Sequence, residues 1–421
     1  MFKFIHAADI HLDSPMYRLE AYEGAPVEEV RQATRRAFEN LIDTAVGEPA
    51  DFLLIAGDLF DGSWKDYNTG LYFVGQMRRL KEAGIPVCVI SGNHDAAGKM
   101  TRTLPYPENV HVLSHRKPET LTLDSLKVAI HGQSFSNPAV TDNLALAYPD
   151  PIAGWFNIGL LHTSLTGREG HENYAPCTLD DLRLKGYDYW ALGHVHQYEI
   201  ASVDPPVVFP GCIQGRHIRE SGAKGGVLVS VEDGAAPDID FQAFDVIRWE
   251  HVIVDVQGVM SKQECLDRLK ESMEVVVREH HPQPVITRLT FDGATDAHAE
   301  IAADPGNWKE VVRSAALSEF GEAVWIEKVI VHMQAKQKDH KTLSDPGPIR
   351  ELERLVSEIA SDDDSLKDLA GELFPLFRKL PAEYREGENA IVSDNPEQIR
   401  RIVEQAHALL VRRLKKEAPG S

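Results

Sequence analysis

The 421-residue chain has few cysteines, no long apolar run and no excess of basic residues. Its four cysteines lie far apart and form no C-x-x-C pair, which argues against a disulfide framework and against a structural zinc site. No stretch approaches the roughly 20 apolar residues that a membrane helix needs, and the N-terminus runs into a strand-like pattern rather than a cleavable leader. We therefore expect a cytoplasmic protein with reduced thiols and no membrane segment.

Basic charge is scarce, because 44 lysines and arginines stand against 65 aspartates and glutamates, for a formal net charge of −21. Such a balance excludes a basic protein that coats DNA and argues against a membrane-surface protein. It leaves room for an enzyme that acts on nucleic acid, since screening over about 8–10 Å makes the local field decisive. The last predicted helix, 396–416, is a basic island with an apolar stripe on its other face.

Short apolar runs alternate with helical stretches along the first part of the chain. The predicted strands are 2–7, 52–56, 87–91, 156–161 and 189–192, with helices at 27–46 and 67–83. This alternation predicts an α/β layer architecture. Length and linker signals then divide the chain into a main domain (1–240), a second small α/β domain (245–338) and a helical C-terminal region (349–416).

Five segments place candidate metal ligands directly after predicted strands. They are Asp9-Ile10-His11, Gly57-Asp58, Gly92-Asn93-His94-Asp95, His162 and Gly193-His194-Val195-His196. In an open α/β sheet the carboxyl ends of the strands line one crevice, so five loops would deliver these side chains to one place. Gly57, Gly92 and Gly193 would let the backbone turn sharply and come close to a bound ion.

The candidate ligands are oxygen and nitrogen donors without thiolate, which is typical of Mn, Fe or Zn in five- or six-coordinate sites. Seven of them are too many for one ion but suit two ions that share a carboxylate, as in phosphoryl-transfer hydrolases. The seven are Asp9, His11, Asp58, Asn93, His162, His194 and His196. Two divalent ions, two aspartates and a bridging hydroxide leave about one positive charge, which attracts a phosphodiester even in an acidic protein.

The ordered set D-x-H, G-D, G-N-H-D, H and G-H-x-H resembles the calcineurin-like metallophosphoesterases. Further stretches are similar to the SbcD-type DNA repair nucleases, and most of all to the YhaO-like exonucleases: residues 11–15 (HLDSP), 57–61 (GDLFD), 172–177 (ENYAPC) and 189–196 (YWALGHVH). The resemblance covers residues 1–230, and beyond them only the layout matches. It implies a layered metallophosphoesterase sandwich, a small α/β capping domain and a helical C-terminal tail.

The resemblance also implies a role for each residue of the set. One ion would be held by Asp9, His11 and His196, the second by Asn93, His162 and His194, and Asp58 would bridge both. His94 would stand beside the scissile phosphate, and Asp95 would orient it by a hydrogen bond, although a turn-forming carboxylate is an equal alternative for Asp95. Asp61 stands where some members carry histidine, so its role stays open.

Taken as a whole, the resemblance implies a nuclease that uses two divalent ions, with Mn²⁺ preferred. It would act as a 3′-to-5′ exonuclease on double-stranded DNA ends and as an endonuclease on single strands. The family resemblance further implies a homodimer and a coiled-coil ABC-type ATPase partner (SbcC-like or YhaN-like), with residues 349–416 as the candidate docking region. Two alternatives stay open: a phosphodiesterase for a small nucleotide, and a non-catalytic scaffold of the same fold.

Four basic residues follow the motifs and are candidates for contact with a DNA backbone, with solvated surface as the alternative. They are Lys99, Arg102, Arg216 and Arg219.

Overall fold

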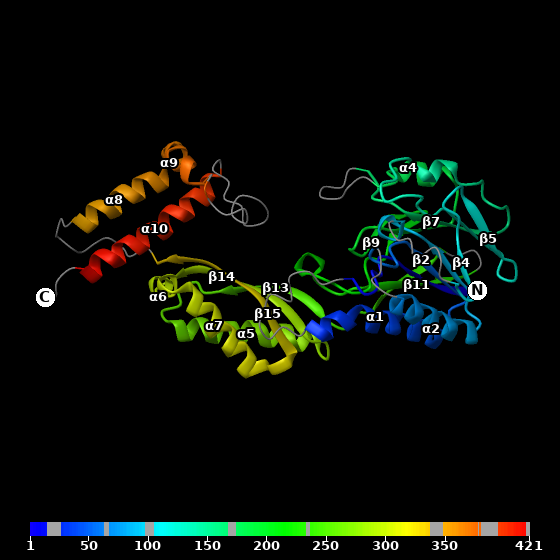
Figure 1. Cartoon of the computed structure of the whole chain (residues 1–421), viewed down its shortest axis with the longest axis horizontal. Helices are drawn as coiled ribbons and strands as arrows, with labels where there is room; N and C mark the ends of the chain where they lie inside the picture. Colours follow the sequence, from blue (N-terminus) through cyan, green and yellow to red (C-terminus); the bar gives the residue numbers. More distant parts are fainter. Residues whose placement is uncertain are drawn as a thin grey trace. The chain divides into compact units, whose positions relative to one another are not determined.

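A computed structural model describes residues 1–14, 27–62, 67–96, 105–166, 174–232, 236–336, 348–377, 379 and 395–417. These residues form three sheets with flanking helices (Figure 1). By its internal contacts the chain divides into two compact units: residues 1–252 with 275–288 and 320–328, and residues 253–274 with 289–319 and 329–421. The division runs through the third sheet, and the domain boundaries expected from the sequence stay a prediction.

The first sheet carries three of the five motif segments. Its order is β12-β11-β1-β2-β3-β4, with β1 (Phe2–Ala7), β2 (Phe52–Ala56), β3 (Val87–Ile90), β4 (Val110–Val112), β11 (Gly225–Val231) and β12 (Asp238–Ala243). Strands β1 to β4 are parallel, whereas β11 pairs antiparallel with both β1 and β12. The carboxyl ends of β1, β2 and β3 therefore lie at one edge, directly before the first three motifs.

The second sheet carries the other two motif segments. Its order is β5-β6-β7-β8-β10-β9, with β5 (Glu119–Leu123), β6 (Val128–Gly132), β7 (Phe156–His162), β8 (Tyr189–Gly193), β9 (Glu199–Val203) and β10 (Pro206–Phe209). Strands β6, β7, β8 and β10 are parallel, so His162 ends β7 at the same edge as the turn after β8. The short helix α4 (Leu179–Leu184) packs on this sheet through Leu182.

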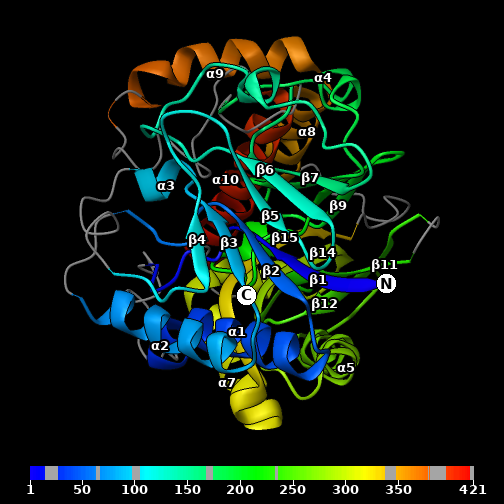
Figure 2. The same cartoon turned by 90° about the vertical axis from the view of Figure 1, so that its right-hand side faces the viewer.

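Alternation along β2 shows how the layers are built. Phe52, Leu54 and Ala56 join a core that also holds side chains of the second sheet, whereas Leu53 and Ile55 join a core with helices α1 (Val27–Gly47) and α2 (Asn68–Glu82). Figure 2 shows these two helices on one side of the first sheet and the second sheet on its other side. Strands buried on both faces need continuous apolar runs, which is how the sequence revealed them. The layered α/β sandwich is confirmed.

One expectation about the sheet is corrected: the motif-bearing strands belong to two stacked sheets rather than to one open sheet. Strand β5 shows why the sequence did not reveal this. Its side chains are alternately half-buried and exposed, and its sequence ETLTL offers only two leucines. Half-exposed edge strands carry a weak apolar signal, so the border between the two sheets has no clear mark in the sequence.

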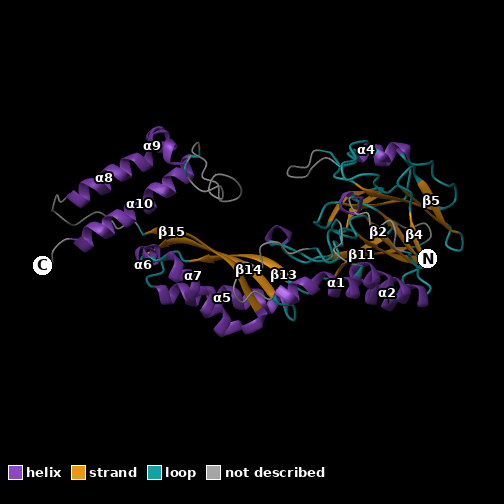
Figure 3. Cartoon of the chain, in the orientation of Figure 1, coloured by secondary structure: helices purple, strands orange, loops and turns teal. Residues whose placement is uncertain are grey.

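The third sheet has the order β13-β14-β15, with β13 (Arg248–Asp255), β14 (Val285–Thr295) and β15 (Val324–Ala335). Helices α5 (Lys262–His280), α6 (His298–Ala303) and α7 (Pro305–Phe320) connect its strands (Figure 3). Phe291 of β14 meets Trp308 of α7 edge-on, with ring centroids 5.5 Å apart. The predicted alternation of strands and helices in this region is confirmed.

Three helices form the C-terminal part: α8 (Pro348–Ser361), α9 (Asp363–Phe377) and α10 (Pro396–Glu417). Leu366, Ala370 and Ile399 are buried where α9 and α10 meet. None of the helices in the described part of the chain combines the length and the apolar composition needed to cross a bilayer. All four cysteines are buried and free, as the sequence predicted.

A buried histidine links the two stacked sheets. His6 of β1 donates from Nε2 to the carbonyl of Leu192 at 3.1 Å, so its Nδ1 accepts the hydroxyl hydrogen of Tyr189, also at 3.1 Å. Burial lowers the pKa of His6 to about 3, although the hydrogen bond to Leu192 partly opposes the shift. The folded protein therefore keeps this imidazole neutral.

Acidification is expected to destabilise the protein through His6, and His6→Gln is expected to reduce that effect. The unfolded chain takes up this proton near pH 6.5 and the folded chain only near pH 3, so stability falls as the pH drops between these values. One such group contributes a slope of up to about 1.4 kcal/mol per pH unit. Glutamine can still accept from Tyr189 and donate to Leu192. Urea unfolding at pH 7, 6 and 5 in EDTA measures the slope.

The matched control is His115→Gln, because His115 is exposed and should leave the slope unchanged. Equal slopes in the wild type and in His6→Gln would contradict the prediction.

Candidate metal centre

Two loops begin where β1 and β2 end, and they run side by side. The amide of Asp9 donates to the carbonyl of Gly57, and the amide of His11 donates to the carbonyl of Asp58, both at 3.0 Å. Asp9, His11 and Asp58 have φ angles of 49°, 46° and 50°, in the left-handed region that side chains other than glycine seldom adopt. Such backbone costs of order 1 kcal/mol per residue, and the surrounding hydrogen bonds hold it in place.

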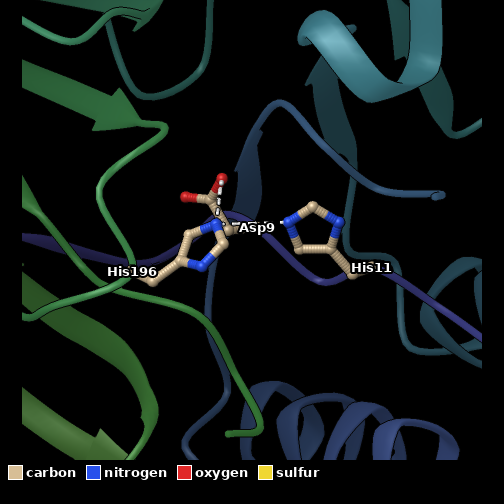
Figure 4. Close-up of side chains that lie close together, drawn as sticks. All are labelled: Asp9, His11 and His196. Atoms are coloured by element: carbon tan, nitrogen blue, oxygen red, sulfur yellow. Dashed lines mark hydrogen bonds and ion pairs between the residues drawn. The ribbon is translucent and has the colours of Figure 1, made fainter. Parts of the chain in front are cut away.

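The first cluster joins the D-x-H loop to the end of the G-H-x-H motif (Figure 4). The Nε2 atoms of His11 and His196 lie 3.3 Å apart, and His196 Nε2 lies 3.7 Å from Asp9 Oδ1. Asp9 Oδ1 and His11 Nδ1 are buried and have no hydrogen-bond partner among the described residues. His11 Nδ1 belongs to the other side of the ring, so the atoms that face one another are the two Nε2 atoms and Asp9 Oδ1. Unpaired buried polar atoms are costly, so these three atoms fit a cation that would accept their lone pairs.

The second cluster is centred on His162 of the second sheet, and its electron-pair donors also face one another. His162 Nδ1 lies 2.9 Å from the carbonyl of Ala56 and must donate to it, which leaves the lone pair of Nε2 facing the site. That Nε2 lies 3.0 Å from Asn93 Oδ1 and 3.5 Å from Asp58 Oδ2, both electron-pair donors. Burial would lower the pKa of His162, but the carboxylate of Asp58 raises it to about 9.

Asp58 belongs to two of the side-chain groups that could hold a metal ion. It lies with His11 and His94 in one group and with Asp9 and His162 in another. Its Oδ1 accepts the backbone amide of His94 at 2.9 Å, and its Oδ2 lies 4.0 Å from His11 Nε2. Burial would raise the pKa of Asp58, but the charge and hydrogen bond of His162 lower it to about 2, so the group stays ionised. A buried carboxylate shared by two groups fits the bridging position between two cations.

His194 completes the set. Its backbone amide donates to Asp9 Oδ2 at 2.9 Å, and its ring lies edge-on to that of His162 with centroids 5.3 Å apart. The structure thus brings all seven candidate ligands to one rim, where the carboxyl ends of both stacked sheets meet. The electron-pair donor atoms that face one another there fit two divalent ions.

The expected role of Asp95 is corrected. Its carboxylate accepts the backbone amides of Leu59, Phe60 and Gly92 at 2.8–3.1 Å, so it ties the G-N-H-D turn to the G-D loop, as the alternative of a turn-forming carboxylate predicted. The partner of His94 is Asp61, whose Oδ1 lies 2.6 Å from His94 Nδ1. The hydrogen bond that His94 donates to Asp61 raises the pKa of His94, because it favours the charged imidazole. The role that the sequence left open for Asp61 is therefore to orient His94.

One acidic residue of this site escaped the sequence analysis. Glu220 is 4% exposed and accepts from His196 Nδ1 at 2.6 Å. It lies 24 residues beyond His196, at the end of the three-residue 3-10 helix Ile218–Glu220, so neither periodicity nor motif spacing pointed to it. Burial alone would raise the pKa of Glu220, but the hydrogen bond of His196 and the charge of Arg216 hold it well below its usual range.

The four basic candidates for DNA contact fall into different places. The side chain of Arg216 is only 14% exposed and forms an ion pair with Glu220. It is therefore neither a solvated surface residue nor a side chain that extends toward a DNA backbone. Arg219 is exposed on the same loop and stays a candidate. Lys99 and Arg102 lie outside the described residues.

Comparisons with known proteins agree with this geometry. A family model for calcineurin-like phosphoesterases matches residues 2–198, and a model for the middle domain of metallophosphoesterase YhaO matches residues 249–334. The chain is 33% identical to an uncharacterized metallophosphoesterase YhaO of Bacillus subtilis over 98% of both chains. It is 28% identical to the DNA double-strand break repair protein Mre11 of Methanopyrus kandleri, over 70% of this chain and 69% of that relative. The Mre11 of Sulfurisphaera tokodaii is also 28% identical, over 60% and 65%.

Proposed function

On the premise that this chain belongs to the YhaO family of calcineurin-like metallophosphoesterases, we propose that it is a DNA nuclease that uses two divalent cations. It acts as a 3′-to-5′ exonuclease on double-stranded ends, with endonuclease action on single strands. The observation that carries the proposal is the rim, where the seven candidate ligands converge beside the Asp61–His94 pair and several of their electron-pair donor atoms face one another. Mn²⁺ is the proposed ion.

The protein's ligands fall into two sets that share Asp58. Asp9, His11 and His196 hold one cation, and Asn93, His162 and His194 hold the other. When bound, the cations would neutralise charge on the phosphoryl oxygens and lower the pKa of water in the site. His162 is fixed through the carbonyl of Ala56 and His196 through Glu220, so these two ligands are oriented before a cation arrives.

His94 supplies the proton for the leaving oxygen. Its Nδ1 is engaged by Asp61, and its side chain is 43% exposed, so a substrate can reach the ring. The pKa of His94 is raised by that hydrogen bond, which increases the fraction of imidazolium near neutral pH. A donor with a pKa near the operating pH protonates a leaving alkoxide efficiently.

Two observations favour DNA over a small phosphodiester. Two of the relatives are named for the repair of DNA double-strand breaks. The third sheet and helices α8–α10 are also more chain than a small substrate needs. We further propose that the chain forms a homodimer in the cytoplasm and that α8–α10 dock a coiled-coil ABC-type ATPase, which would supply basic surface that this acidic chain lacks.

His94→Asn is expected to lower the degradation of duplex DNA by about 10²- to 10⁴-fold while Mn²⁺ binding persists, because asparagine cannot transfer a proton. The assay follows a duplex labelled at the 5′ end, with and without Mn²⁺, in the wild type and the variant. Duplexes whose 3′ ends carry phosphorothioate linkages should resist the wild type if cleavage proceeds from that end.

The matched control is His115→Asn, an exposed histidine outside the site, which should degrade DNA at the wild-type rate. Robust hydrolysis of bis(p-nitrophenyl) phosphate without cleavage of DNA would instead favour the small-substrate phosphodiesterase. Bound Mn²⁺ with hydrolysis of neither substrate would favour the scaffold.

A further inference from the structure

The loop between β10 and β11 holds the metal ligand His196 from two sides. The backbone carbonyl of His196 accepts from the amide of Cys212 and from Lys224 Nζ, both at 3.3 Å. The ring is held by Glu220 at 2.6 Å. A carboxylate can only accept, so His196 Nδ1 carries the hydrogen and the lone pair of Nε2 faces Asp9 and His11.

Arg216 holds both oxygens of Glu220. Its backbone amide donates to Oε2 at 2.7 Å, and its guanidinium donates from Nη2 to Oε1 at 3.0 Å. The side chains of Arg216 and Glu220 are 14% and 4% exposed, so their charges neutralise each other largely out of water. A carboxylate engaged in this way has one fixed orientation toward His196.

The same guanidinium reaches the other side of the rim. Arg216 Nη1 donates to Ser14 Oγ at 3.4 Å and lies 3.8 Å from Asp61 Oδ2. Ser14 in turn donates its hydroxyl hydrogen to Asp61 Oδ2 at 2.6 Å, which leaves Oδ1 for His94. One arginine thus lies between the carboxylate that orients a metal ligand and the carboxylate that orients His94.

We propose that Arg216 and Glu220 are a positioning pair that sets His196 for the cation and, through Ser14 and Asp61, sets His94 for the leaving group. The geometry assigns neither residue a contact with substrate. For its activity readout this inference rests on the proposed phosphodiester hydrolysis, whereas its metal-binding readout stands without it.

Substitution of Glu220 is expected to weaken Mn²⁺ binding, and substitution of Arg216 is expected to lower kcat. Glu220→Gln removes the charge that holds Arg216 and loosens His196, so Mn²⁺ affinity should fall about 10- to 100-fold. Arg216→Met, assayed at saturating Mn²⁺ with bis(p-nitrophenyl) phosphate, should lower kcat about 10-fold and leave KM unchanged. In the His94→Asn background the same Arg216 substitution should cost no further kcat, because its effect passes through His94. Titration of free Mn²⁺ by electron paramagnetic resonance measures the affinity.

The matched control is Arg288→Met. Arg288 forms a similar two-point ion pair with Glu327 in the third sheet, at 2.9 and 2.8 Å, with both side chains 16% exposed. This variant loses a half-buried ion pair but should keep the wild-type Mn²⁺ affinity and kcat. Arg216→Lys keeps the charge, but a single ammonium group cannot contact Glu220 Oε1 and Ser14 Oγ at the same time, so it should show the same kcat defect if Arg216→Met does not fold.

If the wild type is active, two results would overturn the proposal. A rise in KM that persists in the His94→Asn background would show that Arg216 binds substrate, and a loss of stability with unchanged kcat and Mn²⁺ affinity would show a purely structural pair. If the wild type binds Mn²⁺ but hydrolyses neither DNA nor the small substrate, the proposed function fails by itself. The affinity of Glu220→Gln then decides the positioning pair, and a wild-type value overturns it.

Discussion

Asp58→Asn is expected to abolish Mn²⁺-dependent hydrolysis, with a loss of at least about 10³-fold, because Asp58 Oδ2 lies 4.0 Å from His11 Nε2 and 3.5 Å from His162 Nε2, one ligand of each set. Asparagine keeps the shape and can still accept the amide of His94, but it lacks the negative charge that two cations would share. The stabilisation by Mn²⁺ should disappear as well. A ligand at 100 times its Kd stabilises a protein by about 2.7 kcal/mol, and this shift should be present in the wild type and absent in the variant. Thermal unfolding with and without Mn²⁺ measures it.

The matched control is Asp245→Asn, a carboxylate buried as fully as Asp58 that engages Arg248 at 2.9 and 3.0 Å. This substitution should lower stability without affecting the Mn²⁺ shift or hydrolysis. A Mn²⁺ shift of wild-type size in Asp58→Asn would show that Asp58 does not bridge cations, and the two-ion centre would have to be abandoned.

The ligands could be predicted because they follow strands. An apolar run such as 52–56 announces a buried strand, and the residue that ends it faces the rim whichever sheet the strand joins. His162 and Asp58 therefore meet at 3.5 Å even though the expected single sheet is in fact two stacked sheets. The error about the sheets had no effect on the site, because both sheets present the carboxyl ends of parallel strands at the same edge.

The groups that orient the ligands could not be predicted in this way. Glu220 contacts His196 from the loop between β10 and β11. Hydrogen bonds from side chains to the backbone fix the path of this loop; for example, the side-chain amide of Gln214 donates to the carbonyl of Ile247 at 2.7 Å. Asp61 precedes His94 by 33 residues, whereas Asp95 follows it directly. Sequence spacing therefore favoured Asp95 as the partner of His94. The backbone decided otherwise, since the turn directs Asp95 to the amides of Leu59 and Phe60.

Strain at the rim is a second feature that the sequence concealed. Asp9, His11, Asp58 and His194 all have positive φ, although none is glycine. Of the three glycines beside the ligands, Gly57 has a φ of 93°, as expected for a sharp turn, whereas Gly92 and Gly193 provide space for neighbouring atoms. Several ligands themselves also adopt the unusual backbone. Strained backbone and lone pairs that face one another lower the stability of the folded protein. In return, the ligands are already in place to bind cations.

Gly92→Ala is expected to disable the centre although Gly92 contributes no ligand. A Cβ at this position would lie 2.3 Å from Asp58 Oδ1 and 2.8 Å from both the amide nitrogen of Asp58 and Cε1 of His162. Backbone atoms cannot give way, so the carboxylate must turn away from its place between the two ligand groups. We expect Mn²⁺ affinity to fall at least about 100-fold and stability to fall by about 1–3 kcal/mol from overpacking. Mn²⁺ titration and urea unfolding measure the two effects.

The chain provides its own control for this substitution. Gly75 lies in the exposed middle of α2, where an added Cβ would have no atom within 4 Å, so Gly75→Ala should stabilise the helix by about 0.5–1 kcal/mol and leave Mn²⁺ binding unchanged. The same methyl group would then have opposite effects at two glycines, and only the distance to Asp58 distinguishes them. Wild-type Mn²⁺ affinity in Gly92→Ala would show that the Asp58 carboxylate has room to move, and a bridging position that depends on close packing would be wrong.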